Sequence, residues 1–463
     1  MKRIKFAALM LALLGIMASC NKVDDEETTT TLYGDAAITG FSLGTMNRYV
    51  NGVKSTFAGS AYHFNIDQAS HLIFNSDSLP VGTDIAHVLC NVTALNNGSI
   101  WIQTLEDASI IQAYSAYDSI DFTKDRQFEV YASNGSGYKS YTVRVNVHKQ
   151  EGEEFTWTRL AHNADMAQMD GLKAVVCNGV KYVFGQMSGQ TRLLASEDGN
   201  SWTEPASNIN TLFAADAWQN VCVKNDTIFM LTNGTLLKCT NGTDWEQVAS
   251  SSATLTLKRL IGASTAELYA QADDNLLYVS KNGKDWKPET IDDAETLLPT
   301  AHIAMVSYPM LLADSTDNVV MAGSRDVAAY PNDTIDMVWR KIADYQKHAP
   351  ESHWSYMERT DRNRLALPRM ESVNLLRYDD TILAFGGKGI GNTKHAAFQI
   401  MYQSRDNGIT WKQNKKFVIP TTFDSSATYV SATVDDDNNI WLFSAGTGEV
   451  WRGRLNRLGW EYQ

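Results

Sequence analysis

The sequence predicts an all-β protein in which a β-sandwich is followed by a six-bladed β-propeller. The 463 residues hold 12 Trp and 19 Tyr against nine Pro, and long helical patterns are few. Short alternating strands separated by turns run from residue 35 to residue 150. From residue 155 to residue 463, a unit ending in tryptophan recurs six times. Its length of about 40–50 residues suits a propeller blade of four short strands.

Composition limits the partners. A chain of this length is expected to hold two or more domains, and its 44% hydrophobic and 20% charged residues are typical of a globular protein. The formal net charge is −13, and loss of Lys2, Arg3 and Lys5 with a leader makes it −16. So acidic a chain, with no cluster of Lys and Arg among aromatics, repels phosphates. We therefore expect no nucleic-acid partner.

The first 20 residues predict the compartment. A basic start precedes an apolar run from Phe6 to Met17, which is too short to span a bilayer as a stable helix. Small residues then lead to Cys20. This pattern resembles the lipobox of bacterial lipoproteins, which implies a signal peptide over 1–19 and a lipid on Cys20 that holds the chain on the outer membrane. The alternative is a plain secretory signal with an incidental cysteine.

Residues 20–34 predict an acidic tether. The run from Asp24 to Glu27 resembles the surface-export signal of lipoproteins from Bacteroidetes-type bacteria, which implies exposure at the cell surface. The alternative is a solvated linker with no export role, on a protein that faces the periplasm.

Four further cysteines lie in apolar, strand-like runs without the C-x-x-C spacing of zinc or redox motifs. They are Cys90, Cys177, Cys222 and Cys239. We expect buried free thiols, with one bridge between Cys222 and Cys239 as the alternative, and we predict no metal site.

The strands of residues 35–150 include an opening I-T-G-F-S-L, an L-P-V-G-T-D turn and a closing Y-T-V-R-V. The closing strand alternates, with Tyr141, Val143, Val145 and Val147 on one face. This arrangement resembles the immunoglobulin-like β-sandwich modules behind the anchor of Bacteroidetes surface lipoproteins. The Cys…Trp…Cys spacing of antibody domains is absent, so only the architecture carries over. The resemblance implies a spacer that lifts the next domain from the membrane.

After a charged hinge at 151–154, turns that end in tryptophan mark the blades. Four such turns end at Trp202, Trp245, Trp286 and Trp411, and Trp339 and Trp460 fit the same slot with a degraded turn. Asp or Asn accepts backbone N–H bonds in such a turn, Gly supplies a positive φ, and Trp is expected to pack between blades. The turn at 404–411 resembles the Asp-box of sialidase-like propellers, and residues 385–387 resemble a kelch strand. Residues 157–160 also look like an outer strand, which leaves a seventh blade open.

Sialidase activity is not expected from the turn. Sialidases also need three arginines around a carboxylate and a Phe/Tyr-Arg-Ile-Pro start, and that start is absent. A fold does not transfer a function.

Two long connections predict a ligand platform. The interval between Trp339 and Trp411 exceeds its neighbours, and the excess falls at 340–370 and 386–398, both expected beside the central channel on one face. Aromatic rings stack on sugars and arginines bind carboxylates. The candidate ligand-binding residues are Trp354, Tyr356, Arg359, Arg362, Arg369, Lys388, Lys394 and His395. The alternative is that Trp354 and Tyr356 pin a long loop. No spacing singles out catalytic residues, and no cofactor is predicted.

Leader, tether, sandwich and propeller together resemble the two-domain lipoproteins of unknown function in gut Bacteroidetes. With the platform, the resemblance favours a non-catalytic, surface-anchored binding protein whose propeller engages a glycan or an envelope protein. The alternatives are a polysaccharide hydrolase or lyase on the same scaffold, and a structural subunit of an outer-membrane complex.

Overall fold

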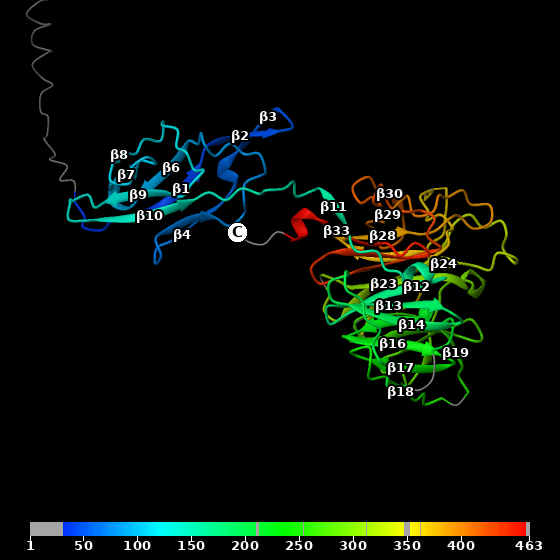
Figure 1. Ribbon diagram of the computed structural model, residues 1–463. Helices are drawn as coiled ribbons and strands as arrows, with labels where there is room; N and C mark the ends of the chain where they lie inside the picture. The colour runs from blue at the N-terminus through cyan, green and yellow to red at the C-terminus, as the bar shows by residue number, and fades with distance from the viewer. Residues whose placement is uncertain are drawn as a thin grey trace, which may run out of the picture. The chain divides into compact units, whose positions relative to one another are not determined.

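The computed structural model describes residues 31–209, 213–252, 254–311, 313–346, 352–361 and 363–459. The chain divides into two compact units, and their described parts are residues 31–149 and 150–459 (Figure 1). In these ranges the regular structure is β-strand and short 3₁₀ helix, without an α-helix. None of the described helices has the length and apolar character needed to cross a membrane.

The first unit is a β-sandwich over one apolar core. Its larger sheet has the order β4-β5-β10-β9-β7-β8, in which β10 runs parallel to β5 and antiparallel to β9. A second pair, β1 and β6, shares the core, and β2 and β3 form a hairpin. The strands are β1 (Ile38–Leu43), β2 (Thr45–Val50), β3 (Val53–Ala58), β4 (Phe64–Asp67), β5 (Leu72–Asn75), β6 (Cys90–Ala94), β7 (Ser99–Gln103), β8 (Ile111–Ala113), β9 (Arg126–Tyr131) and β10 (Tyr138–Arg144), with 3₁₀ turns η1 (Gly59–Ala61) and η2 (Leu95–Asn97). The alternation predicted for the closing strand is present, because Tyr141 and Val143 are fully buried.

The second unit contains six antiparallel sheets, one per blade. Blade one is β12 (Leu172–Cys177), β13 (Val180–Met187) and β14 (Gln190–Ser196), with Thr203 bridged to its edge; blade two is β15 (Val221–Lys224), β16 (Thr227–Thr232), β17 (Thr235–Cys239) and β18 (Glu246–Val248); blade three is β19 (Leu257–Ala263), β20 (Leu268–Ala272), β21 (Leu277–Ser280) and β22 (Lys287–Pro288). Blade four is β23 (Ala301–Pro309), β24 (Thr316–Ser324), β25 (Met337–Asp344) and β26 (Ser355–Tyr356); blade five is β27 (Asn374–Tyr378), β28 (Thr381–Phe385), β29 (Tyr402–Ser404) and β30 (Lys412–Gln413); blade six is β31 (Tyr429–Val434), β32 (Ile440–Ala445), β33 (Val450–Leu455) and β11 (Phe155–Arg159). The 3₁₀ turns are η3 (Met166–Gln168), η4 (Ala217–Asn220), η5 (Glu295–Leu297) and η6 (Asn456–Gly459).

The ring is closed by the first strand of the unit. β11 pairs antiparallel with β33, from Phe155 opposite Leu455 to Arg159 opposite Trp451. The outer strand recognised at residues 157–160 therefore completes the sixth blade, and the described strands form no seventh.

Six apolar cores, one between each pair of neighbouring blades, hold the ring together. In β28, Ile382 and Ala384 pack with residues of blade four, whereas Leu383 and Phe385 pack with residues of blade six. Successive side chains of a strand point to opposite faces, so an apolar run serves two cores at once. This explains why the middle strands of the blades read as unbroken hydrophobic segments.

The four predicted tryptophan turns share one bonding pattern. Each indole N–H donates to the carbonyl of the turn glycine, as Trp411 does to Gly408 at 3.0 Å. The N–H of that glycine donates to a side chain at the end of the third strand, which is serine in three turns and Cys239 in the fourth. The glycines have φ between +73° and +88°, so a side chain there is strained.

Blade four departs from the predicted pattern. Trp339 lies inside the third strand, β25, while Trp354 directly precedes the fourth strand, as the four turn tryptophans do. Trp354 therefore fills the slot assigned to Trp339. Trp460, the other degraded turn, lies outside the described residues.

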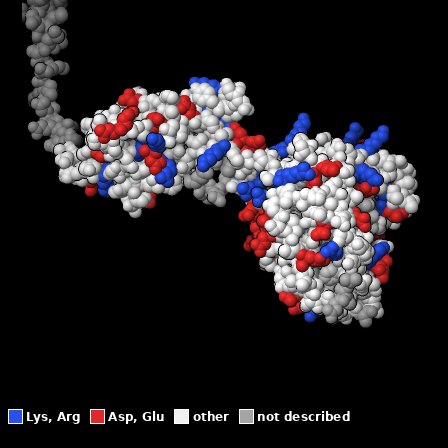
Figure 2. All heavy atoms as spheres, viewed as in Figure 1, with Lys and Arg blue, Asp and Glu red and all other residues white. Residues whose placement is uncertain are grey.

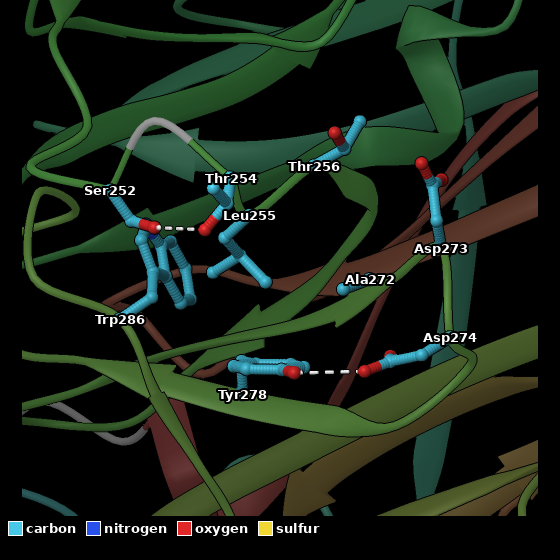
Figure 3. Close-up of a pocket in the computed structure, with 9 residues that line it drawn as sticks. All are labelled: Ser252, Thr254, Leu255, Thr256, Ala272, Asp273, Asp274, Tyr278 and Trp286. Carbon is cyan, nitrogen blue, oxygen red and sulfur yellow. Dashed lines mark hydrogen bonds between the residues drawn. The ribbon is translucent and has the colours of Figure 1, made fainter.

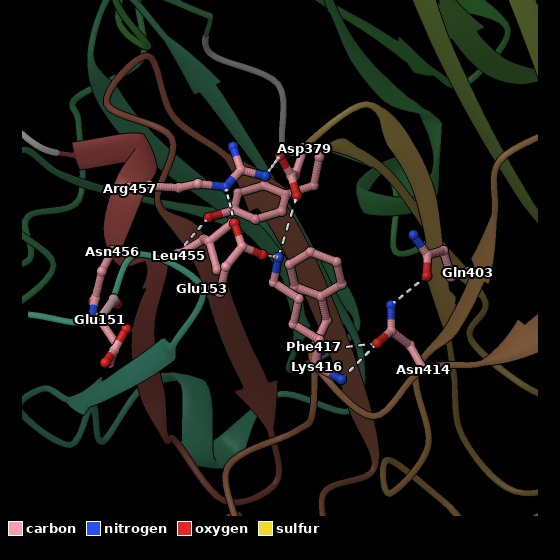
Figure 4. A network of polar contacts seen from close by, with 11 residues as sticks. Glu151, Glu153, Asp379, Gln403, Asn414, Lys416, Phe417, Leu455, Asn456 and Arg457 are labelled. Atoms are coloured by element: carbon pink, nitrogen blue, oxygen red, sulfur yellow. Dashed lines mark hydrogen bonds and ion pairs between the residues drawn. The ribbon is translucent and has the colours of Figure 1, made fainter. Parts of the chain in front are cut away.

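A polar network joins the start of the propeller unit to its end (Figure 4). Arg457 binds Glu153 at 2.6 Å and also pairs with Asp379, while Lys416 pairs with Glu153. The Lys416 and Arg457 contacts lower the pKa of Glu153. The charged segment at 151–154 thus takes part in closing the ring.

Candidate functional site

The centre of the ring holds a cavity of about 590 Å³. Residues of all six innermost strands line it, mainly near the points where these strands begin. A cavity of this size suits a small ligand or the end of a chain. We call six of its polar lining residues the channel mouth: Lys173, Arg259, His302, Glu371, Ser372 and Tyr429.

Two cations of the channel mouth have only carbonyl partners among the described residues. Lys173 on β12 donates to the backbone oxygen of Gln219 at 3.3 Å, and Arg259 on β19 donates to that of Thr300 at 2.9 Å. Loss of solvation lowers the pKa of both, and the charge of Arg259 lowers the pKa of Lys173 further. Asp216 and Tyr429 act in the opposite direction on the pKa of Arg259.

His302 lies at a bulge in β23 and is exposed to the channel. Its φ is +52°, and Ser372 opposite it has the same value, a conformation that non-glycine residues seldom adopt. The N–H of Ser372 donates to His302 Nδ1 at 3.3 Å, so this nitrogen is an acceptor and the neutral ring carries its proton on Nε2. Loss of solvation, Arg259 and Arg369 all lower the pKa of His302.

The remaining ionisable groups of the cavity add one negative charge. Glu371 is half-buried, and its nearest cation is Lys388 at 3.8 Å. Burial raises the pKa of the Tyr429 phenol and of the Cys222 thiol to about 12, so both stay neutral at physiological pH. The channel mouth is therefore cationic in a protein of net charge −13. On the face of the propeller seen in Figure 2, by contrast, acidic and basic side chains are interspersed.

Three connections cap blades four and five beside the channel mouth. The N–H of Ile390 donates to the carbonyl of Arg369, and Ile335 and Pro368 form a bridge, so the segments 325–336, 366–372 and 386–395 are tied together. Arg369 is fully buried and donates to the carbonyls of Arg325 and Tyr330 at 2.6 and 2.8 Å. Arg369 therefore braces this cap, in contrast to the ligand contact expected of it.

The two aromatic residues predicted for the platform, Trp354 and Tyr356, lie at the fourth strand of blade four, β26. Trp354 is 1% exposed and donates through Nε1 to Glu289 at 2.7 Å. The N–H of Tyr356 donates to Asp293, and its half-buried ring lies against Trp339. Both residues are thus held against the 289–293 segment, and neither lines the central cavity.

The other predicted platform residues are dispersed. Arg359, Lys388 and Lys394 are exposed. His395 is half-buried, its Nδ1 donates to the carbonyl of Gly387 at 3.0 Å, and burial lowers its pKa. Arg362 lies outside the described residues, as does Cys20. Arg359, Lys388, Lys394 and His395 do not line the central cavity.

A second concavity of about 450 Å³ lies on blade three (Figure 3). We call it the blade-three pocket; its lining includes Ser252, Thr254, Asp273, Asp274, Tyr278 and Trp286. The Tyr278 hydroxyl donates to Asp274 at 2.8 Å, which raises the pKa of Tyr278. Asp273 and Asp274 are exposed, so this pocket is acidic where the channel mouth is basic.

No group of three or more His, Cys, Asp and Glu side chains among the described residues is arranged to hold a metal ion. Cys90, Cys177, Cys222 and Cys239 are all buried free thiols.

Six closed blades around a polar channel define a six-bladed β-propeller, joined here to an N-terminal β-sandwich. The chain belongs to the DUF6242 family: residues 151–463 match its beta propeller domain, and residues 41–145 match the N-terminal domain of this domain of unknown function. No curated protein matches the sequence.

Several solved structures are similar to this chain at low identity. Virginiamycin B lyase from Staphylococcus aureus is 10% identical, with 65% of this chain and 99% of that chain covered and a TM-score of 0.36. A carbohydrate-active enzyme of family AA12 from Trichoderma reesei is 10% identical, with coverage of 65% and 96% and a TM-score of 0.40. The WD40 beta-propeller domain of Doa1 is 10% identical, with coverage of 66% and 99% and a TM-score of 0.33.

Proposed function

We propose that this protein is a cell-surface-anchored, non-catalytic binding lipoprotein that holds a glycan in its channel mouth. The observation that carries the proposal is a cavity of about 590 Å³ in which Lys173 and Arg259 have, among the described residues, only backbone partners. A cavity of this volume has room for one or two sugar rings. A stable protein partner instead needs a contact area of about 800 Å² on each side.

The anchor is the second part of the proposal. It rests on the leader, on Cys20 and on the acidic residues that follow, which together favour the outer face of the outer membrane over its periplasmic side. A Cys20→Ala variant is expected to lose incorporation of labelled fatty acid and to leave the membrane fraction. Protease treatment of intact cells separates the two faces, since only a surface-exposed propeller is cleaved.

The binding test uses the chain from Asp24 onward, which retains both compact units, on an array of host and plant polysaccharides. We expect a saturable signal for at least one glycan without release of shorter products. An array with no signal would favour a protein as the ligand instead of a glycan. Co-purification of one envelope protein at high salt would then favour a structural subunit of an outer-membrane complex.

A polysaccharide lyase or hydrolase is the second candidate, because His302, Glu371 and Tyr429 line the same cavity as the two cations. A neutral histidine can take a proton, and cations can hold a substrate carboxylate while it does so. Enzyme activity predicts product release that is lost in His302→Gln and in Tyr429→Phe. Binding without turnover by the unaltered chain would exclude it for the glycans tested.

A further inference from the structure

We propose that the group held in the channel mouth is an anion, the carboxylate or sulfate of an acidic saccharide, with Arg259 and Lys173 as its direct partners. This inference rests on the proposed function, since it names the ligand class of that same site. It goes further in requiring that recognition depend on charge.

The first argument is the balance of charge in the cavity. Lys173, Arg259 and His302 supply the basic groups of the lining, and Glu371 is its one carboxylate. Lys173 and Arg259 are half-buried, and Asp216, outside the lining, is the carboxylate whose charge acts on Arg259. A partly desolvated charge gains from a close opposite charge, which an incoming anion supplies to both cations.

The second argument is the chemistry of the donors. Arg259 Nη1 is occupied by the carbonyl of Thr300, whereas its other N–H groups have no partner among the described residues. Lys173 has one carbonyl partner and can donate two further hydrogen bonds. Guanidinium and ammonium groups with donors to spare bind carboxylates and sulfates more strongly than they bind neutral hydroxyls.

The third argument is the backbone at His302 and Ser372. Both residues have φ of +52°, and the bulge in β23 sets His302 beside the N–H of Ser372. Non-glycine residues seldom adopt this conformation, and such backbone strain is found at ligand sites. Here it presents the imidazole to the same cavity as Arg259 and Lys173.

The fourth argument is the shape of the site. The acidic protein as a whole repels a polyanion, so an acidic chain is held where the local charge is positive. The cavity has room for the end of such a chain. Its lining comes from the innermost strands of the ring, which a flat protein surface does not reach.

The experiment compares probes that differ only in charge, by calorimetry with the chain from Asp24 onward. The carboxylate probe is oligogalacturonate, and its neutral control is the methyl ester. The sulfate probe is a chondroitin sulfate oligosaccharide, and its control is the desulfated form. We expect saturable binding of at least one anionic probe, weakening with added salt, and at least about tenfold weaker binding of its neutral counterpart.

The variants locate the charge. Arg259→Gln is expected to weaken binding of the anionic probe at least about tenfold, and Arg259→Lys to restore part of it. Lys258→Gln is the matched control, because Lys258 is the adjacent residue of the same strand and its amine binds Asn275 outside the cavity. Thermal unfolding of each variant separates loss of binding from loss of fold.

The outcomes separate this inference from the proposed function. Equal binding of charged and neutral probes, or Arg259→Gln binding like the unaltered chain, overturns the inference while leaving a glycan-binding protein. Binding of an acidic peptide but of no saccharide overturns both. Silence toward every saccharide, with the chain folded, likewise defeats both.

Discussion

The channel mouth and the blade-three pocket are concavities of similar size with opposite designs. The cavity at the channel mouth is lined by all six innermost strands, and Lys173 and Arg259 have only carbonyl partners among the described residues. The blade-three pocket is formed by residues of blade three and the link before it, and its carboxylates are exposed to water. Water satisfies a charge at the surface, whereas a charge inside the ring needs a partner. The difference shows why the deeper site is the one expected to select its ligand by charge.

The largest effect is expected on the free energy of unfolding, from the titration of the buried Asp336 at the end of the cap segment 325–336. Burial raises its pKa to about 8, although a hydrogen bond from Ser324 and the charge of Arg369 lower it. A folded pKa above the unfolded one means that stability is lost as pH rises from about 4 through about 8. We predict that urea unfolding of the unaltered chain shows a loss of several kcal/mol over this range. That loss should disappear in Asp336→Asn and persist in Asp274→Asn, whose carboxylate is exposed.

The next effect sharpens the comparison of the two sites. Lys173→Gln combined with Arg259→Gln is expected to weaken an anionic saccharide about a hundredfold, since two charge-assisted bonds are removed. Asp273→Asn with Asp274→Asn should change the same affinity by less than about twofold. Calorimetry on both double variants measures the contrast. Similar losses in the two would mean that the acidic saccharide does not discriminate between the sites.

His302 is expected to make binding depend on pH. Arg259 on β19, Arg369 in the cap and loss of solvation lower its pKa, while Glu371 beside Ser372 and Lys173 on β12 share the cavity. An anion favours the charged imidazole, so binding takes up a proton and strengthens as pH falls below about 6.5. We predict about a fivefold gain in affinity between pH 7.5 and pH 5.5. A His302→Gln variant with the same gain would contradict this role.

The smallest effect belongs to the blade-three pocket. The hydrogen bond to Asp274 raises the pKa of Tyr278, so Asp274→Asn should move the titration of this phenol to lower pH. Ultraviolet difference spectra of Asp274→Asn, with Tyr278→Phe to identify the signal, measure the change. An unchanged titration would show that the hydrogen bond has no effect in solution.

The blades could be predicted from the sequence because each is built from neighbouring residues. A turn such as 404–411 carries its own bonding partners, and its glycine and tryptophan therefore recur at readable positions. The tryptophan turn of blade four could not be predicted in this way. Trp354 donates to Glu289 instead of a turn glycine, so no glycine is required and the signature is lost.

The channel mouth could not be predicted in the same way. Lys173 and His302 are single polar residues in the runs GLKAVV and AHIAMV, and Arg259 follows Lys258 in the run LKRLIG. Each run alone indicates an ordinary strand. Only closure of the ring brings them together. The shared signal was a polar residue at the start of an innermost strand, which becomes informative once the blades are aligned. The unequal spacing of the blade tryptophans pointed instead to the cap, where Arg369 donates its hydrogen bonds to backbone carbonyls.

The pairing of β11 with β33 sets the order in which this molecule can be completed. Phe155 and its partner Leu455 lie near opposite ends of the propeller sequence, and the edge of β11 stays unpaired until they meet. Contacts between such distant residues form slowly, because a long loop must close before they stabilise the fold. The five other blades pair strands that follow one another in the sequence. The two ends of the propeller must therefore meet to close the ring, and a chain that stops before β33 leaves β11 without its partner.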